Sequence, residues 1–206
     1  MNLFMATFIF PLFIFSLLYI TSSAAAVGPA STTTTNNFIQ SKCSSTTYPT
    51  VCVQSLSSFA NKIQTSQRQL TQTALIVSLA KARYTKAYVA HLAHSNGLKP
   101  SEFGPIKDCF EVIGDTVDRL SMSIHEFQSA ARAHSSDFLW HMSNVQTWVS
   151  AALTDENTCV DGFSGRAVSS RMKNGIKTQF QGVLQCTSNA LTLVNQFADK
   201  YSPNDV

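Results

Sequence analysis

Apolar residues recur every three to four positions over four long stretches of the chain, which is the spacing of one face of an α-helix. The alternation of apolar and polar residues that marks a strand is absent, and prolines and glycines are few. Short polar breaks separate the stretches, so consecutive helices are expected to run antiparallel. The pattern predicts an all-α fold, an antiparallel four-helix bundle, with helices over residues 67–94, 101–131, 138–152 and 168–197.

The same spacing predicts which residues face the core of the bundle. In the first stretch they are Leu70, Ala74, Val77, Ala80, Tyr84, Ala87 and His91. In the third stretch they are Phe138, Met142, Val145, Val149 and Ala152. Asp161-Gly162 and Gly165 are expected to separate the third helix from the fourth. Asp155 and Glu156, just after the stripe, are expected to be exposed acids in a turn after a helix.

The chain before the bundle divides into three parts. Residues 1–26 are almost free of polar side chains and turn small near Ala24 and Ala26, which is typical of a secretory signal peptide. Residues 27–37 are polar and low in complexity, so a disordered linker is expected. From Phe38 to Phe59 the chain then looks like two short helical segments that meet at a bend, Tyr48-Pro49. The bundle domain is predicted over residues 38–201, followed by a tail over 202–206.

Five cysteines suit two disulfides and one free thiol in a secreted protein. Cys43 and Cys52 are near enough in sequence to close a local loop. An antiparallel pair of helices brings Cys109 and Cys159 to the same end, because the turn between the helices lies midway between them. Cys186 would lie about 30 Å from that end at the rise of an α-helix. We therefore predict the pairs Cys43–Cys52 and Cys109–Cys159, with Cys186 free and buried.

The net charge of +3 hides an uneven distribution. Seven basic residues and no acid lie between Val27 and Ser101, whereas five acids and one base lie between Glu102 and Asp118. A nucleic-acid binder would show a denser basic patch with interleaved aromatic residues, so we exclude that class.

Motifs of catalysis and metal binding are missing. In the segment 162–165, GFSG, the second glycine is not at the spacing that a nucleophile elbow requires. The segment also lacks the strand–turn–helix context of that motif. The Glu-x-x-His motif of di-metal bundles does not occur, and His91 and His94 share a helix face without a third ligand apparent from the sequence. We expect a protein that is not an enzyme and that uses no cofactor and no metal.

A row of acids is the one charged pattern that points to a partner. Asp108, Glu111, Asp115 and Asp118 are spaced by three or four residues, so they line one side of the second helix. A solvated face is the plain interpretation. However, Glu111 and Asp115 are like charges one turn apart, and a helix that tolerates this repulsion has a plausible docking surface for a basic partner.

Several segments resemble the plant invertase and pectin methylesterase inhibitor family. They are residues 43–52 (CSSTTYPTVC), 108–120 (DCFEVIGDTVDRL), 148–163 (WVSAALTDENTCVDGF) and 187–191 (TSNAL). The resemblance spans residues 38–201 and implies a four-helix bundle with an N-terminal helical hairpin and the two disulfides predicted above. The segment 148–163 looks like the pectin methylesterase inhibitor branch.

The resemblance also implies a function and a site. We expect a secreted, monomeric inhibitor in the cell wall that covers the pectin-binding cleft of pectin methylesterase in a one-to-one complex. By position, the contacts fall on Glu111, Asp115, Asp118, Thr158 and Asp161, although Thr158 can instead only shape the turn and Asp161 can instead cap the fourth helix. Two alternatives stay open: an inhibitor of acid invertase, and a bundle for wall signalling or small-ligand carriage without an enzyme target.

Overall fold

The computed structural model describes residues 29–95, 98–130, 135–163 and 168–201, and every element in this part of the chain is a helix. The predicted signal peptide lies outside the described residues. In chain order the helices are α1 (Pro29–Cys43), α2 (Pro49–Ser57), α3 (Ala60–Ile63), α4 (Gln67–Ala93), α5 (Pro100–Ala130), α6 (Ser135–Gly162) and α7 (Ser170–Lys200).

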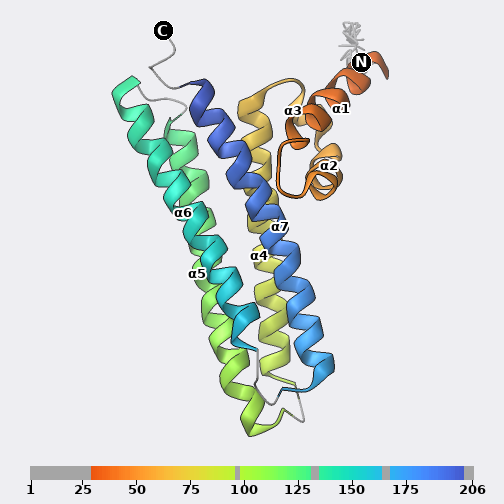
Figure 1. The fold of residues 1–206 in the computed structure, drawn as a ribbon, viewed down its shortest axis with the longest axis vertical. Helices are drawn as coiled ribbons and strands as arrows, with labels where there is room; N and C mark the ends of the chain where they lie inside the picture. Colours follow the sequence, from red (N-terminus) through yellow and green to blue (C-terminus); the bar gives the residue numbers. More distant parts are fainter. Residues whose placement is uncertain (1–28, 96–97, 131–134, 164–167, 202–206) are drawn as a thin grey trace, which may run out of the picture.

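Helices α4 to α7 form the predicted bundle, and α1 to α3 form a smaller unit at one end (Figure 1). Each long helix packs against two neighbours: α5 lies between α4 and α6, and α7 lies between α6 and α4. The bundle therefore has an α5–α6 side and an opposite α4–α7 side. None of the helices in the described part of the chain has the length and the apolar run that a membrane crossing needs.

The cysteine prediction is confirmed. Cys43 pairs with Cys52 across the α1–α2 bend, Cys109 of α5 pairs with Cys159 of α6, and Cys186 is a free, buried thiol on α7. In the chain-entropy model, bridges of these loop lengths stabilise a fold by roughly 3 and 4 kcal/mol. The second bridge joins the N-terminal part of α5 to the C-terminal end of α6, which is the lower end of the bundle in Figure 1.

A buried amide attaches the N-terminal unit to the bundle. The Asn189 side chain of α7 accepts a hydrogen bond from the Tyr48 backbone N–H and donates one to the Tyr48 carbonyl, both at 2.9 Å. Asn189 is 3% exposed, so both of these bonds form away from water. One side chain thus satisfies two backbone groups of the bend and fixes the hairpin on α7.

The N-terminal linker prediction is corrected by α1. The composition of residues 27–37 predicts disorder, but the helix begins at Pro29. Its packed end supplies the physical reason: Thr35 and Ile39 are buried, and Cys43 is tied to α2. A weak helical sequence is held in place by contacts at one end, because tertiary packing overrides a small difference in propensity.

The predicted core stripe of the first helix is wrong in its second half. Ala80, Ala87 and His91 are exposed, and Tyr84 is 63% exposed. The buried face of α4 instead contains several hydroxyl residues, which are Thr71, Thr73, Ser78 and Thr85. Some of these satisfy their hydroxyls on backbone carbonyls, as Ser78 does on Ala74 at 3.0 Å. A polar residue whose side chain hydrogen-bonds to the backbone can occupy a core position. The prediction from apolar spacing did not include such residues and was therefore wrong here.

The third helix extends ten residues beyond the predicted stripe, to Gly162. The predicted core residues from Phe138 to Ala152 are all buried, as expected. The stripe then continues through Glu156, Cys159 and Phe163, which are also buried. A glutamate at a core position interrupted the apolar pattern, so the prediction of Asp155 and Glu156 as exposed acids in a turn is wrong.

Candidate functional site

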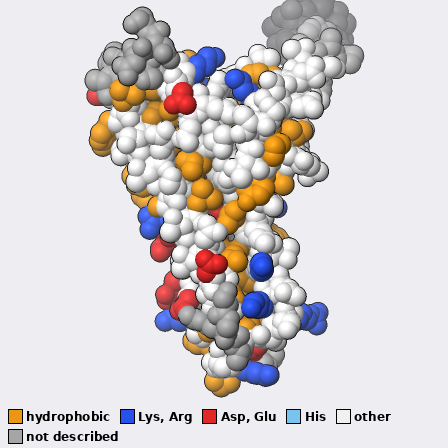
Figure 2. All heavy atoms as spheres, in the orientation of Figure 1, with side chains coloured by type: hydrophobic (Ala, Val, Ile, Leu, Met, Phe, Trp, Pro, Cys, Tyr) orange, Lys and Arg blue, Asp and Glu red, His pale blue; other side chains and the backbone are white. Residues whose placement is uncertain are grey.

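The acids predicted on the second helix lie on one exposed strip of α5. Asp108, Glu111, Asp115 and Asp118 are all solvent-exposed, and their spacing lines them up on one outward face of α5. Asp108 lines a hollow together with Thr158 of α6, and the charge of Asp115 acts on Asp155 of α6. We call this strip the acidic ridge. In Figure 2 acidic side chains of the lower half lie toward the left edge, where α5 and α6 run.

Glu111 has a local partner that contributes little to stability. Its carboxylate lies 3.5 Å from the Lys107 ammonium one turn earlier. Both side chains are about 60% exposed, at 61% and 62%, so water screens the pair and either group can exchange it for another partner. The ridge therefore keeps carboxylates that a docking protein can reach.

Arg119 joins the acidic ridge to α6. Its Nε donates to Asp155 Oδ2 at 2.7 Å across the α5–α6 seam. Burial nevertheless raises the pKa of Asp155, since desolvation outweighs the pairing with Arg119, and the like charge of Asp115 adds to the same effect. Arg119 is thus engaged between the helices, and the ridge and the adjacent face of α6 form one surface.

The Cys109–Cys159 disulfide lies beneath this surface at its lower end. A hollow of about 110 Å³ lies next to the disulfide. Asp108 and Val112 of α5 and Thr158 of α6 line it. The disulfide holds the two helices at a Cα–Cα distance of 4.9 Å, so the lower parts of the ridge and of α6 cannot separate while it is intact.

Thr158 and Asp161 both lie on exposed positions of α6. The Thr158 hydroxyl donates to the Thr154 carbonyl at 2.8 Å within the helix, so its methyl group and oxygen face solvent in a fixed rotamer. Asp161 lies in the last turn of α6, and the N-cap of α7 is Ser169. The alternative role of Asp161 as a cap of the fourth helix is therefore wrong.

Small side chains continue from Thr158 up the same side of α6. They follow a spacing of three or four residues, and their short side chains leave a flat strip beside the acidic ridge. The strip consists of Thr147, Ala151, Thr154 and Thr158. The α5–α6 surface thus combines carboxylates on one helix with small, hydroxyl-bearing side chains on the other.

Two apolar residues at the upper end of this surface were not singled out in the sequence. Trp140 of α6 is 63% exposed and Met122 of α5 is 42% exposed. Glu126 fixes the seam beside them by accepting hydrogen bonds at 2.8 Å from His141 Nδ1 and Asn144 Nδ2. Burial opposes ionisation of Glu126, but these two donors together lower its pKa. Trp140 lies on the polar side of α6, opposite the apolar stripe. This position is the sequence signal that could have identified it as exposed.

Glu156 points away from this surface into the core. It is 0% exposed, and its Oε1 accepts a hydrogen bond from Thr187 of α7 at 2.9 Å. Its Oε2 has no partner among the described residues. Burial raises the pKa of Glu156 to about 8, an effect that the hydrogen bond from Thr187 opposes and the charge of Asp155 reinforces. This carboxyl is neutral in mildly acidic solution.

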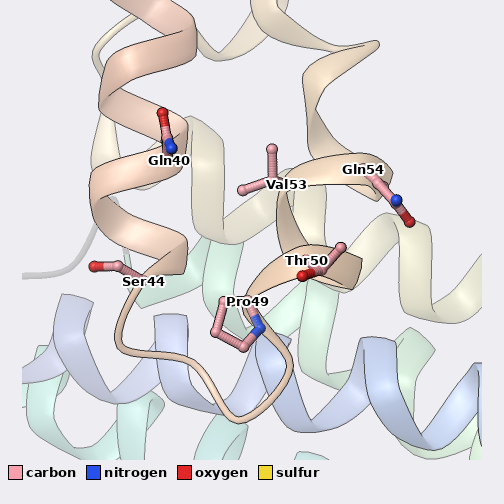
Figure 3. A pocket seen from close by; sticks show the side chains of 6 residues that line it. All are labelled: Gln40, Ser44, Pro49, Thr50, Val53 and Gln54. Carbon is pink, nitrogen blue, oxygen red and sulfur yellow. The ribbon is translucent and has the colours of Figure 1, made fainter.

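The described residues contain no group of three or more His, Cys, Asp or Glu side chains placed to hold a metal ion. Another hollow, of about 360 Å³, lies between α1 and α2, where Gln40 faces Val53 and Pro49 begins α2 (Figure 3). Its lining contains no charged side chain and no nucleophile paired with a base. The exposed carboxylates of α5 and the small polar side chains of α6 suit contact with another macromolecule.

Comparisons with known proteins agree with this picture. The family model described as plant invertase/pectin methylesterase inhibitor matches residues 37–193. An Arabidopsis thaliana protein named Pectinesterase inhibitor 11 is 50% identical over 192 residues, covering 92% of this chain and 95% of that protein. Pectinesterase inhibitor 9 of the same plant is 48% identical over 194 residues, covering 93% and 95%.

A solved structure has the same fold. The crystal structure of mutant form A of a pectin methylesterase inhibitor from Arabidopsis superposes with a TM-score of 0.62 and covers 76% of this chain and 95% of its own. The two sequences are 17% identical, so this likeness concerns the fold alone.

Proposed function

The chain belongs to the plant invertase/pectin methylesterase inhibitor family, and from this premise we propose that it inhibits pectin methylesterase. One observation carries the proposal: over nearly its full length the chain is 50% identical to a protein named as a pectinesterase inhibitor. The family name also covers invertase inhibitors, but both of the Arabidopsis relatives described above are named for pectinesterase. The chain is an inhibitor rather than an enzyme.

The α5–α6 surface is the proposed contact with the enzyme. Glu111, Asp115 and Asp118 supply exposed carboxylates for a basic patch on the partner, and Thr158 and Asp161 extend the contact on α6. Such carboxylates steer the encounter and fix its register. A rigid, flat helical pair loses little conformational entropy on docking, which favours a tight complex.

Trp140 and Met122 complete the proposed contact at its upper end. Exposed Trp is the residue type that most often anchors a protein interface, because its large ring buries much apolar area in a pocket of the partner. The contact would then run along the length of α5 and α6, with carboxylates below and an aromatic anchor above.

The protein is proposed to act outside the cell, as a monomer that forms a one-to-one complex. The apolar, small-residue pattern of residues 1–26 supports export, and two disulfides suit an oxidising compartment. The buried carboxyl of Glu156 is uncharged at the mildly acidic pH of the cell wall. The fold therefore does not have to bury a charge there.

A titration tests the proposed target. Purified mature protein is added in steps to a plant pectin methylesterase at pH 6, and the acid released from methylesterified pectin is measured. We expect release to fall linearly and to stop near one equivalent. A parallel assay of sucrose hydrolysis by acid invertase should be unaffected. Loss of invertase activity alone would establish the other branch, and inhibition of neither enzyme would support a bundle without an enzyme target.

A further inference from the structure

The bundle separates its charges by side, and the proposed contact with pectin methylesterase uses only one of them. Within its bounds α4 contains no Asp or Glu, and α6 contains no Lys or Arg. Helix α7 carries a single acid, Asp199, near its C-terminal end. In Figure 2 several Lys and Arg side chains lie on the right of the lower half, along α7 and opposite the acidic edge. The α4–α7 side is therefore a basic surface without an assigned partner.

Two glycines of α7 shape the seam with α4. A Cβ added at Gly175 would overlap the hydroxyl of Tyr88, and a Cβ at Gly182 would lie 3.6 Å from the Lys81 ammonium. The Tyr88 and Lys81 side chains of α4 therefore lie over the two positions of α7 that have no side chain. The glycines are seven residues apart, or about 10 Å along the helix axis. The Tyr88 phenol and the Lys81 ammonium therefore lie at two successive points along the α4–α7 seam.

Tyr84 lies between these two residues on α4. It is three positions after Lys81 and four before Tyr88, so the three side chains are neighbours on one stripe of the helix. Its ring is 63% exposed. Arg171, which is exposed and lies one turn before Gly175, adds positive charge from the same face of α7. We call Lys81, Tyr84, Tyr88 and Arg171 the basic strip.

The cations of the basic strip are available to a ligand. Among the described residues, no carboxylate lies within 4 Å of the Lys81 or Arg171 side-chain nitrogens. Two acids do reach α7: Asp199 lies near its C-terminal end, and the Glu102 carboxylate accepts a hydrogen bond from the Ser169 N–H just before its first turn. Helix α4 has no acid within its bounds, so the seam beside Lys81 and Tyr84 stays basic. Exposed aromatic rings flanked by unpaired cations suit a ligand that offers both flat apolar faces and negative charges.

We propose that the α4–α7 side binds the carboxylate-bearing sugar polymer that pectin methylesterase produces. This inference rests on the proposed function. Hydrolysis of a methyl ester consumes water and leaves a carboxylate, a proton and methanol, so the enzyme converts neutral pectin units into acidic ones. The carboxylates would pair with Lys81 and Arg171, and the C–H faces of the sugar rings would pack on Tyr84.

Binding of this kind would hold the inhibitor where the enzyme has already acted. The α5–α6 surface remains free for the enzyme, because the two sides of the bundle are opposite. An acidic polymer is favoured over an anionic membrane. Arg171 lies eleven residues, or about 16 Å, before Gly182, where the Lys81 ammonium lies, so two separated cations beside an exposed tyrosine match a chain better than a flat lipid surface.

The test measures polymer binding without the enzyme. The mature protein is run by affinity electrophoresis through gels that contain polygalacturonate, highly methylesterified pectin or no polymer, in 50 mM and 200 mM salt. Binding to vesicles that contain anionic phospholipid is measured in parallel by sedimentation. We expect retardation by polygalacturonate alone, and weaker retardation at higher salt.

Two charge-matched variants locate the site. The variant Lys81→Glu with Tyr84→Ser should bind polygalacturonate at least about fivefold more weakly. Lys62→Glu, at an exposed position of α3, should bind nearly as well as the unaltered protein. Equal loss in both variants, no retardation of the unaltered protein, or binding to vesicles but not to polygalacturonate would overturn the proposal.

Calorimetry of the same preparations with pectin methylesterase keeps the two proposals apart. The Lys81/Tyr84 variant should bind the enzyme like the unaltered protein in the absence of polymer. If polygalacturonate binding fails while enzyme binding persists, only the inference about the α4–α7 side is wrong. If enzyme binding fails while the polymer still binds, the proposed function is wrong and the basic strip stands.

Discussion

Replacing Glu156 with Gln should remove most of the loss of stability that the bundle suffers as the pH rises. The carboxyl is fully buried, and only one of its oxygens has a hydrogen-bond partner among the described residues. Its pKa rises from 4.5 to about 8 on folding because burial disfavours the charged form. The folded state therefore holds a proton that the unfolded chain releases near pH 4.5.

The sign and the size follow from this difference. A raised carboxyl pKa favours folding fully below pH 4.5, and the contribution is lost as the pH rises through about 8. Each pKa unit corresponds to about 1.4 kcal/mol, so the whole interval is worth about 5 kcal/mol as an upper value. Between pH 5 and pH 8 the unaltered protein should lose of order 3 kcal/mol of its free energy of unfolding through this one group.

Urea unfolding followed by far-ultraviolet circular dichroism at pH 5 and pH 8 measures the effect. At pH 5 the Glu156→Gln variant should be equal to the unaltered protein or less stable by about 1 kcal/mol, because the amide brings a second unpartnered donor. At pH 8 it should be the more stable of the two by about 2 kcal/mol.

Glu111→Gln removes the same charge at an exposed position and is the matched control. Its free energy of unfolding should follow the pH dependence of the unaltered protein. Other titrating groups affect all three proteins alike, so only the differences between them matter. Parallel pH dependences for the unaltered protein and the Glu156→Gln variant would refute the assignment of a neutral, buried carboxyl.

Three further substitutions test the packing that positions the surfaces. Gly175→Ala should lower the thermal midpoint, since overlap with the Tyr88 hydroxyl costs about 1–3 kcal/mol and exceeds the gain in helix propensity; the double variant with Tyr88→Phe should recover part of the loss. Gly104→Ala, where a Cβ meets nothing within 4 Å, should instead stabilise by up to about 1 kcal/mol. Asn189→Ala should leave the Tyr48 N–H without its partner, while the Tyr48 carbonyl keeps the hydrogen bond from the Cys52 N–H; the loss should cost about 1–3 kcal/mol, with hydrogen exchange increasing first in the N-terminal hairpin. Unchanged exchange in that hairpin would contradict the role of Asn189.

The sequence predicts the bundle well because most of its core is apolar and periodic. The stripe from Phe138 to Ala152 is buried throughout, and the disulfides follow from where helical geometry brings cysteines together. The errors occur where polar residues occupy core positions, as Glu156 does on α6 and Ser78 on α4. Their burial depends on partners in other turns and helices, which a residue pattern does not contain.

The candidate site could be predicted only in part. The spacing of the acids correctly places Glu111 and Asp115 together on one exposed strip. It does not reveal that Arg119 is engaged with Asp155 on α6, because that contact depends on the register of two helices. The exposure of Trp140, in contrast, could have been predicted, because the residue lies opposite the apolar stripe that begins at Phe138 and Met142.

The most direct test of docking through the α5–α6 surface compares two charge-reversed proteins in the pectin methylesterase assay. One carries Lys at positions of the acidic ridge, by Glu111→Lys, Asp115→Lys and Asp118→Lys. The other carries Glu on the opposite side, by Lys81→Glu and Arg171→Glu. Circular dichroism first establishes that both are folded. We predict that the first needs at least about 100-fold more protein for half inhibition, whereas the second matches the unaltered protein. Equal inhibition by all three proteins, or loss only in the second, would contradict the account.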